Sequence, residues 1–384
     1  RRKNERRRIS IKGKIFLRGR PSGEIKTAMD DKTQKRTCAK ALDLIGSAVD
    51  EMFLAPGRIM TFFQSRRKTD WQHYAREVAF YEEQRYVKDP RKFFVLPAEP
   101  PDYTVETQAS YQSGFYQVLS FPSLYEPQNP YVRDRYLGYA ENRRGYLVRW
   151  THGDTPRKTV LCVHGFMMGA PREAERMFKI RALFSMGLDV ALFIQPFHWK
   201  RVAGPRAARR VYLTPGDAAF TNECVAHSIY DLENCFCLLK KLGATDIGLI
   251  GASLGGYVTG IYICVSARAK FAAMMVPALT LLRPMSPDAF LKRAPFDSKW
   301  RARVCRAADF HSPLHLQPRI PADTILVVAS RGDRLCPIEP VEQLKLRWNL
   351  SRCHCRTGGH WLVFDKIRGR AWYGLLRDMN FMEG

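Results

Sequence analysis

The stretch that most constrains this chain is residues 246–256, Asp-Ile-Gly-Leu-Ile-Gly-Ala-Ser-Leu-Gly-Gly. An apolar, partly β-branched run leads directly into Gly-Ala-Ser-Leu-Gly at residues 251–255, which has the pattern G-x-S-x-G. The segment that follows, residues 257–269, is largely apolar and contains no proline. This order predicts a buried strand, a very tight turn that carries Ser253, and a buried helix.

A serine on such a turn has a particular chemistry. The turn holds the serine in a strained backbone conformation that pushes its hydroxyl above the sheet. Side chains two positions away on either side would collide, so glycine is expected at 251 and 255. The next helix directs its free N–H groups and the positive end of its dipole at the same point. We therefore predict a nucleophilic Ser253, with a structural serine in a tight turn as the alternative.

A serine hydroxyl is a weak nucleophile and needs a base, usually a histidine that a carboxylate orients. On this kind of sheet the carboxylate and then the histidine follow the serine in the chain. An apolar strand ends in Ser-Arg-Gly-Asp333, and a glycine pair precedes His360. We predict Asp333 and His360 as these partners. Asp333 as the cap of a helix that begins near Pro337 is one alternative. The competing histidines are His311, His315 and His354.

These motifs resemble those of the α/β-hydrolases over roughly residues 111–384. A fourth motif, an apolar strand at 159–163 followed by His-Gly, is similar to the oxyanion loop of that family. The resemblance implies a Ser-His-Asp triad and an oxyanion hole formed by the backbone N–H groups of Phe166 and Leu254. Each such donor contributes about 3 kcal/mol to stabilising the transition state. It also implies a structural role for His164 and no need for a metal or organic cofactor.

The order of patterns predicts an α/β fold with a mostly parallel central sheet and helices on both faces. Apolar runs indicate strands at 115–121, 145–150, 159–163, 188–195, 247–250 and 271–276 and before Asp333. Helical patterns cover 173–186 and a long segment from Asp217 to about Leu242. Residues 277–320 lie where the family commonly inserts a cap over the site, so they are predicted as a cap insertion.

The first 110 residues precede this core. Residues 1–37 are strongly basic and are predicted as a flexible arm. Residues 38–110 are predicted as a helical extension and linker, and residues 111–384 as the hydrolase core. In the extension, apolar positions Leu42, Ile45, Val49 and Met52 recur at helical spacing, and Asp70 is expected to cap a second helix that reaches Val87. Residues 89–113 are predicted as a connecting loop.

The net charge is +25, from 62 Lys and Arg against 37 Asp and Glu, and the first 40 residues hold fifteen basic and four acidic side chains. Such charge is typical of a solvated arm, and an anionic membrane surface is the alternative partner. No specific nucleic-acid partner is predicted.

The loop at 196–201 should lie at the same edge of the sheet as Ser253. His198 and Trp199 are therefore predicted to bind substrate. The cations of this loop, Arg201, Arg206, Arg209 and Arg210, and those of the predicted cap, Arg303 and Arg306 among them, could hold an anionic head group, with a solvated charge pattern as the alternative.

Ten scattered cysteines, several in apolar runs, favour buried free thiols and a reducing compartment. We therefore expect a cytoplasmic protein, peripheral to a membrane in the alternative. The pair Cys353 and Cys355 around His354 lacks the second ligand pair of a structural zinc site and is predicted as an alternating strand without metal.

The function that these observations favour is cleavage of a small-molecule or lipid carboxylic ester through an acyl-enzyme. An acyltransferase and an amide or thioester hydrolase use the same chemistry up to that intermediate and remain open. A basic scaffold without turnover, bound to anionic membrane or nucleic acid, is the alternative from a different class.

Overall fold

The computed structural model describes residues 37–52, 54–55, 69–202, 215–281, 290–363 and 366–382. By its internal contacts the chain divides into two compact units, Arg1–Ala41 and Leu42–Gly384. Residues 1–36 of the predicted arm lie outside the described residues. So does part of the predicted cap, at 282–289.

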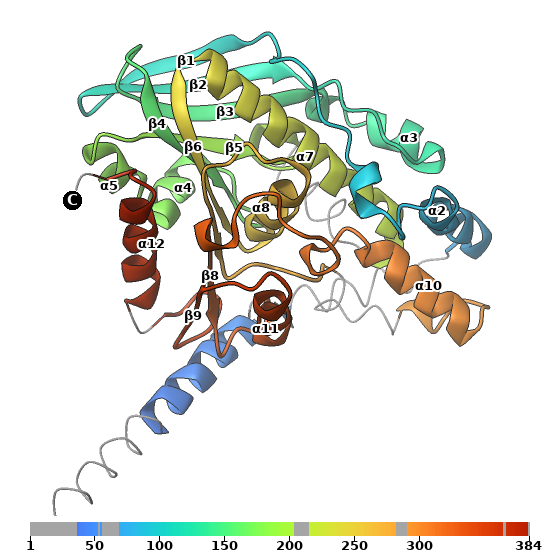
Figure 1. Cartoon of the computed structure of the whole chain (residues 1–384). Helices are drawn as coiled ribbons and strands as arrows, with labels where there is room; N and C mark the ends of the chain where they lie inside the picture. Colours follow the sequence, from blue (N-terminus) through green and yellow to red (C-terminus); the bar gives the residue numbers. More distant parts are fainter. Residues whose placement is uncertain are drawn as a thin grey trace, which may run out of the picture. The chain divides into compact units, whose positions relative to one another are not determined.

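One sheet organises the larger unit, and in the described part of the chain it has nine strands in the order β1-β2-β3-β5-β4-β6-β7-β8-β9 (Figure 1). The neighbours from β5 across to β9 are parallel, and the three pairs from β1 to β5 are antiparallel. The mostly parallel α/β fold predicted from the sequence is confirmed. The strands are β1 (Thr104–Tyr111), β2 (Gly114–Pro122), β3 (Arg144–Thr151), β4 (Arg157–Val163), β5 (Asp189–Ile194), β6 (Ala244–Ala252), β7 (Ala272–Met275), β8 (Ile325–Ser330) and β9 (Arg352–Arg356).

Helices cover both faces of this sheet, because its central strands are apolar on both sides. In β5, Val190 and Leu192 join one core, whereas Ala191 and Phe193 join the other. The first core is closed by α4 (Pro171–Phe178), α5 (Ile180–Ser185) and α12 (Ile367–Asp378). The second is closed by α7 (Ala218–Lys241), α8 (Leu254–Val265) and α11 (Ile338–Arg347).

Two predicted segments differ from the structure. The connecting loop predicted for 89–113 is wrong for Thr104–Tyr111, which forms β1. This strand lies at the edge of the sheet and is exposed at all but its last residue, so no apolar alternation marks it. The helix predicted for 173–186 is two helices, α4 and α5. Lys179 separates them in a left-handed conformation with φ 56°. The sequence analysis also did not anticipate α3 (Pro130–Leu137).

The helix that Asp70 caps packs on the predicted cap segment. The Asp70 carboxylate accepts from the N–H groups of Gln72 and His73 at the start of α2 (Trp71–Glu83), as predicted. The Trp71 ring lies 6.4 Å from that of Trp300 in α10 (Ser298–Asp309), so the aromatic stripe of α2 is core, as predicted. No helix in the described residues is both long and apolar enough to cross a bilayer.

The helix that begins the described residues, over 37–52, buries a different face from the one its pattern predicts. Within the larger unit its buried residues are Gly46, Ser47 and Asp50. Ile45 is 49% exposed and Met52 is 75% exposed, so these two members of the predicted apolar face point to solvent. The polar side of this helix is therefore the side that contacts the protein.

Candidate active site

Ser253 lies between the end of β6 and the start of α8, on the tight turn that the G-x-S-x-G pattern predicts. Its backbone has φ 56° and ψ −118°, which is strained for a residue with a Cβ. The Ser253 N–H donates to the Met275 carbonyl at 3.0 Å, and its own carbonyl accepts from the Ala278 N–H at 3.0 Å. The end of β7 and the loop that follows it therefore hold Ser253 in its strained conformation.

The two flanking glycines are required by space. A Cβ on Gly251 would lie 2.1 Å from the Gly255 carbonyl oxygen, and a Cβ on Gly255 would lie 1.9 Å from the Val163 carbonyl oxygen. Both distances are far shorter than any real contact. Close packing of β4, β6 and α8 therefore depends on glycine at both positions.

Asp333 and His360 form a buried pair beyond the carboxyl ends of β8 and β9. His360 Nδ1 lies 2.7 Å from Asp333 Oδ2, and the two residues are 7% and 4% exposed. The other oxygen, Oδ1, accepts from the N–H groups of Leu335 at 2.9 Å and Cys336 at 2.7 Å. Asp333 does not cap α11, whose N-cap is Pro337. The carboxylate is therefore oriented by its own loop and points its free oxygen at His360.

The competing histidines lie elsewhere or have other partners. His311 is buried between the Tyr257 hydroxyl, at 2.6 Å, and the Asn222 side-chain oxygen, at 3.0 Å. His315 lies 3.9 Å from Asp309, and His354 is exposed in β9.

Cys336 is a member of this cluster that the sequence analysis missed. Its Sγ lies 4.0 Å from Ser253 Oγ, and side-chain atoms of Asp333, Cys336 and His360 all lie within 4.8 Å of one another. The serine and the buried pair therefore meet at one place, although no hydrogen bond in the described residues joins Ser253 to His360. Burial and the nearby Asp333 charge raise the pKa of the Cys336 thiol well above its ordinary value, so it stays protonated.

Three polar groups at ligand spacing are one requirement of a metal site, and Asp333, Cys336 and His360 meet it. Their other contacts argue against this use. One atom each of Asp333 and His360 is taken by their mutual hydrogen bond, and the Cys336 thiol would have to lose its proton in a buried place.

The loop after β4 approaches Ser253 closely. A Cβ on Gly165 would lie 3.4 Å from the Ser253 Cβ. His164, at the start of this loop, is buried between the Gly165 carbonyl at 2.8 Å and the Gln195 N–H at 3.1 Å, which fits the structural role expected for it. Phe166 is partly buried against the core. Leu254 is the first residue of α8, so its N–H has no acceptor within the helix.

His198, predicted to bind substrate, contacts this loop through one ring nitrogen and its own loop through the other. Its Nε2 accepts from the Met167 N–H at 3.1 Å, and its Nδ1 donates to the Pro196 carbonyl at 2.8 Å. Burial lowers the pKa of His198 to about 4, which keeps the ring neutral and able to accept. The Trp199 ring packs on Tyr146 at 5.8 Å, with the Lys200 ammonium 5.2 Å from the Trp199 ring.

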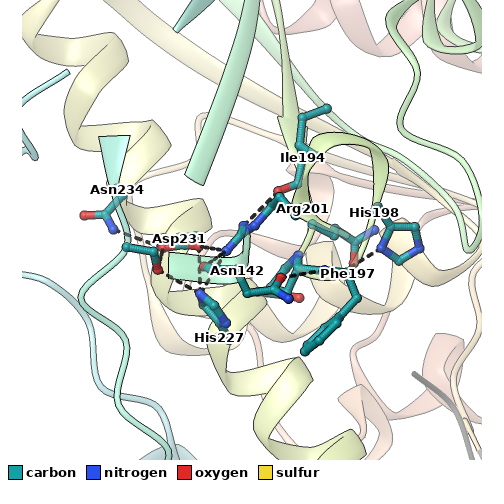
Figure 2. Close-up of polar contacts among 12 residues, drawn as sticks. Asn142, Ile194, Phe197, His198, Arg201, His227, Asp231 and Asn234 are labelled. Atoms are coloured by element: carbon teal, nitrogen blue, oxygen red, sulfur yellow. Dashed lines mark hydrogen bonds and ion pairs between the residues drawn. The ribbon is translucent and has the colours of Figure 1, made fainter. Parts of the chain in front are cut away.

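Arg201 was expected among the cations available to an anionic head group, and that expectation is wrong. The side chain is fully buried and pairs with Asp231 of α7 at 2.7 Å (Figure 2). It also donates to the carbonyls of Ile194 at 3.1 Å and Asn142 at 2.9 Å. Arg201 therefore fixes the loop that carries His198 and is not available to a ligand. Arg206, Arg209 and Arg210 lie outside the described residues.

Two arginines of the predicted cap also have a structural partner. In α10, Arg303 pairs with Glu82 of α2 at 2.6 Å and Arg306 approaches the same carboxylate at 3.8 Å. These pairs are about half exposed on the arginine side. They join the N-terminal extension to the cap segment.

Acid is expected to destabilise this protein through its neutral buried histidines. Burial lowers the pKa of His198 to about 4 and of His311 to about 3, whereas an unfolded histidine titrates near 6.5. As the pH falls from 6.5 toward these values, the unfolded chain binds protons that the folded chain does not. Each of the two histidines should therefore lower the free energy of unfolding by about 2 kcal/mol at pH 5. Urea unfolding at pH 7.5 and pH 5 measures this, and equal values at both would contradict it.

With this geometry in hand, comparison with solved structures identifies the fold class: the chain has the α/β-hydrolase fold. It is similar to acetyl xylan esterase 1 from Thermoanaerobacterium sp. JW/SL YS485, with a TM-score of 0.54, 12% identity, and coverage of 77% of this chain and 93% of the other. An acetyl xylan esterase from Paenibacillus sp. R4 gives a TM-score of 0.52 at 15% identity, over 83% and 96% of the two chains.

Similarity in sequence leads to proteins of unknown role. An uncharacterized protein of Mycobacterium tuberculosis strain H37Rv is 26% identical over 299 residues, which cover 75% of this chain and 70% of that protein. No family model matches the chain. The fold class is therefore shown, and the activity has to be argued from the site.

Proposed function

We propose that this protein is a serine hydrolase that cleaves carboxylic esters through an acyl-enzyme. The observation that carries the proposal is the buried 2.7 Å contact between His360 Nδ1 and Asp333 in the same cluster as the strained Ser253. The similarity in fold to two acetyl xylan esterases supports an ester as the substrate.

The residues of the cluster have distinct roles in this mechanism. Because Asp333 engages Nδ1 of His360, Nε2 is the nitrogen that takes the Ser253 proton when the hydroxyl attacks the acyl carbon. The same imidazolium then returns the proton to the leaving alcohol. Water, activated by His360, attacks the acyl-serine, the acid leaves, and Ser253 regains its proton. A Ser253–His360 hydrogen bond need only form with substrate bound, since such contacts tighten in the reactive complex.

The oxyanion forms next to two backbone donors in this proposal, Phe166 and Leu254. Leu254 begins α8, whose dipole favours negative charge at that end. His198 supports this arrangement by accepting the Met167 N–H, which fixes the loop one residue beyond Phe166. Under this proposal His198 acts on the loop, while direct contact of His198 and Trp199 with substrate stays a prediction.

The acceptor of the acyl group and the substrate's size stay open in the proposal. Acyl transfer, or cleavage of an amide or thioester, would use the same residues, and product analysis with added alcohols or amines separates these from hydrolysis. A lipid ester at an anionic membrane surface likewise stays a prediction that rests on the basic composition. The cytoplasmic location stays a prediction that rests on the scattered cysteines.

Covalent labelling tests the proposal directly. A fluorophosphonate probe is expected to label the wild-type protein, with the adduct on the peptide that contains Ser253. Labelling and turnover of p-nitrophenyl acetate should both be lost in Ser253→Ala, because no other nucleophile occupies that turn. The control is Ser228→Ala, a buried serine in α7 whose hydroxyl donates to the Cys224 carbonyl and which should leave labelling intact. Labelling that survives Ser253→Ala, or an adduct on another residue, would refute the assignment.

A further inference from the structure

One face of the helical segment 42–52 contacts both loops that carry Asp333 and His360. Asp43, Ser47 and Asp50 are spaced four and three residues apart, so they lie on the same side of the helix. Ser47 Oγ donates to the Gly332 carbonyl at 2.7 Å, next to Asp333. Asp43 Oδ1 accepts from the Gly358 N–H at 2.8 Å, two residues before His360. The helix therefore joins two loops that lie far away from it in the sequence.

The helix also lies unusually close to the histidine loop. A Cβ on Gly46 would lie 2.1 Å from the Gly359 nitrogen, and a Cβ on Gly359 would lie 2.5 Å from the Gly46 carbonyl oxygen. Only glycine on both sides permits this approach. The contact is therefore between two backbones, which fixes position more strictly than a contact between flexible side chains.

Asp50 makes the most direct connection between the two loops. Its carboxylate is fully buried, and Oδ2 accepts from the His360 N–H at 2.8 Å and from the Arg334 N–H at 3.0 Å. The other oxygen, Oδ1, also accepts from the His360 N–H, at 3.0 Å. One side chain thus ties the backbone of His360 to the backbone of the residue that follows Asp333.

We propose that Asp50 is a positioning residue that holds His360 and Asp333 at hydrogen-bonding distance and adds a second negative charge beside the imidazole. The consequence for turnover rests on the proposed esterase function. The consequence for the imidazole itself does not, because the His360–Asp333 contact is present whether or not the protein turns over esters.

The charges around His360 define what removal of Asp50 should do. Asp333 and Asp50 are the acidic groups that contact His360, the Cys336 thiol is neutral, and Arg356 donates to the His360 carbonyl at 3.0 Å. Burial raises the pKa of Asp50, while the N–H groups of His360 and Arg334 stabilise its charged form. Loss of the Asp50 carboxylate therefore releases the backbone of His360 and should loosen the contact between His360 Nδ1 and Asp333.

An Asp50→Asn variant tests this with little change in shape. The amide oxygen can replace one carboxylate oxygen, but the amide NH₂ then faces the His360 N–H, so two donors oppose each other. We expect the NMR resonance of the His360 Nδ1 proton, observed in histidine-labelled protein and assigned with His360→Gln, to shift upfield, because the hydrogen bond to Asp333 is no longer held at 2.7 Å. We expect kcat for p-nitrophenyl acetate to fall about 100-fold with KM little changed, because the reacting groups are displaced while the substrate site is not.

Asp189→Asn is the matched control. Asp189 also accepts a backbone N–H, that of His152 at 3.0 Å, together with the Thr151 hydroxyl at 2.7 Å. Asp189 is the first residue of β5 and so lies at the amino ends of the parallel strands, whereas Ser253 lies at their carboxyl ends. Asp189→Asn should lower the thermal midpoint without changing the His360 Nδ1 proton resonance or kcat.

The outcomes separate positioning from general stability. A folded Asp50→Asn protein with the His360 Nδ1 proton resonance and the kcat of the wild type would overturn the proposal. A shifted Nδ1 proton resonance in a protein whose wild type shows no Ser253-dependent turnover would keep the positioning role and refute the proposed function instead. If Asp50→Asn does not fold, Asp50→Glu provides the same test, because the longer side chain moves the carboxylate away from the N–H groups of His360 and Arg334. Changes in the same direction support the proposal and wild-type values overturn it.

Discussion

An Asp333→Asn variant is expected to fold and to lose about 10⁴-fold of kcat toward p-nitrophenyl esters. The reason lies in the second oxygen of Asp333, which accepts two backbone N–H groups, those of Leu335 and Cys336. An asparagine must keep its carbonyl oxygen there, because an NH₂ group would oppose both donors. Its NH₂ group then occupies the position of Oδ2 and donates to Nδ1 of His360. The ring is forced into the tautomer with its proton on Nε2, which cannot accept the proton of Ser253.

Steady-state kinetics and a double variant test this prediction. The thermal midpoint should stay near that of the wild type, since the asparagine keeps the two backbone contacts. Asp333→Asn combined with His360→Gln should be about as slow as His360→Gln alone, because the two residues act as one unit. A kcat within tenfold of the wild type for Asp333→Asn, or losses that multiply in the double variant, would show that the pair does not act on Ser253.

The fold class and the three residues of the proposed triad could be predicted because their signals are local. The G-x-S-x-G pattern predicts the tight turn from five consecutive residues, and a Cβ on Gly251 would collide with the Gly255 carbonyl oxygen within that turn. Asp333 and His360 each follow a strand within a few residues, and parallel neighbouring strands end at one edge of the sheet. The parallel pairing of β8 with β9 is therefore enough to bring Asp333 and His360 close together.

The remaining contacts could not be predicted because they depend on partners far away in the sequence. The pattern of the first helix, with Ile45 and Met52 on its apolar side, suggested that this side is buried. The structure buries the polar side instead, because Asp50 accepts hydrogen bonds from backbone N–H groups of two loops that are distant in the sequence. Cys336 carries no pattern at all, and its place beside Ser253 follows from the turn that Asp333 makes. The sequence predicted Arg201 as a solvent-accessible cation of its loop, because its buried partner Asp231 lies on a helix that is distant in the sequence.

That buried pair supports, through the loop of His198, the loop after β4 that carries Phe166 and Met167. Arg201 is held by Asp231, which also accepts from the Ser123 hydroxyl at 2.7 Å and lies 3.0 Å from His227 (Figure 2). Burial alone would raise the pKa of Asp231, but Arg201 and His227 together lower it below its usual range. The carboxylate is therefore charged inside the protein, and Arg201 is the first of the groups that compensate this charge.

An Arg201→Met variant is consequently expected to lower the free energy of unfolding by about 3–5 kcal/mol, since it leaves the Asp231 charge buried without its cation. Arg201→Met with Asp231→Leu should recover much of this loss, because the charge that needed a partner is gone as well. The control is Arg303→Met, which breaks a pair with Glu82 that is half exposed and should change stability by less than about 1 kcal/mol. Urea unfolding measures all three. Equal losses for Arg201→Met and Arg303→Met would mean that burial of the Arg201–Asp231 pair has no energetic consequence. The loop that holds His198 against Met167 would then have to be fixed by other contacts.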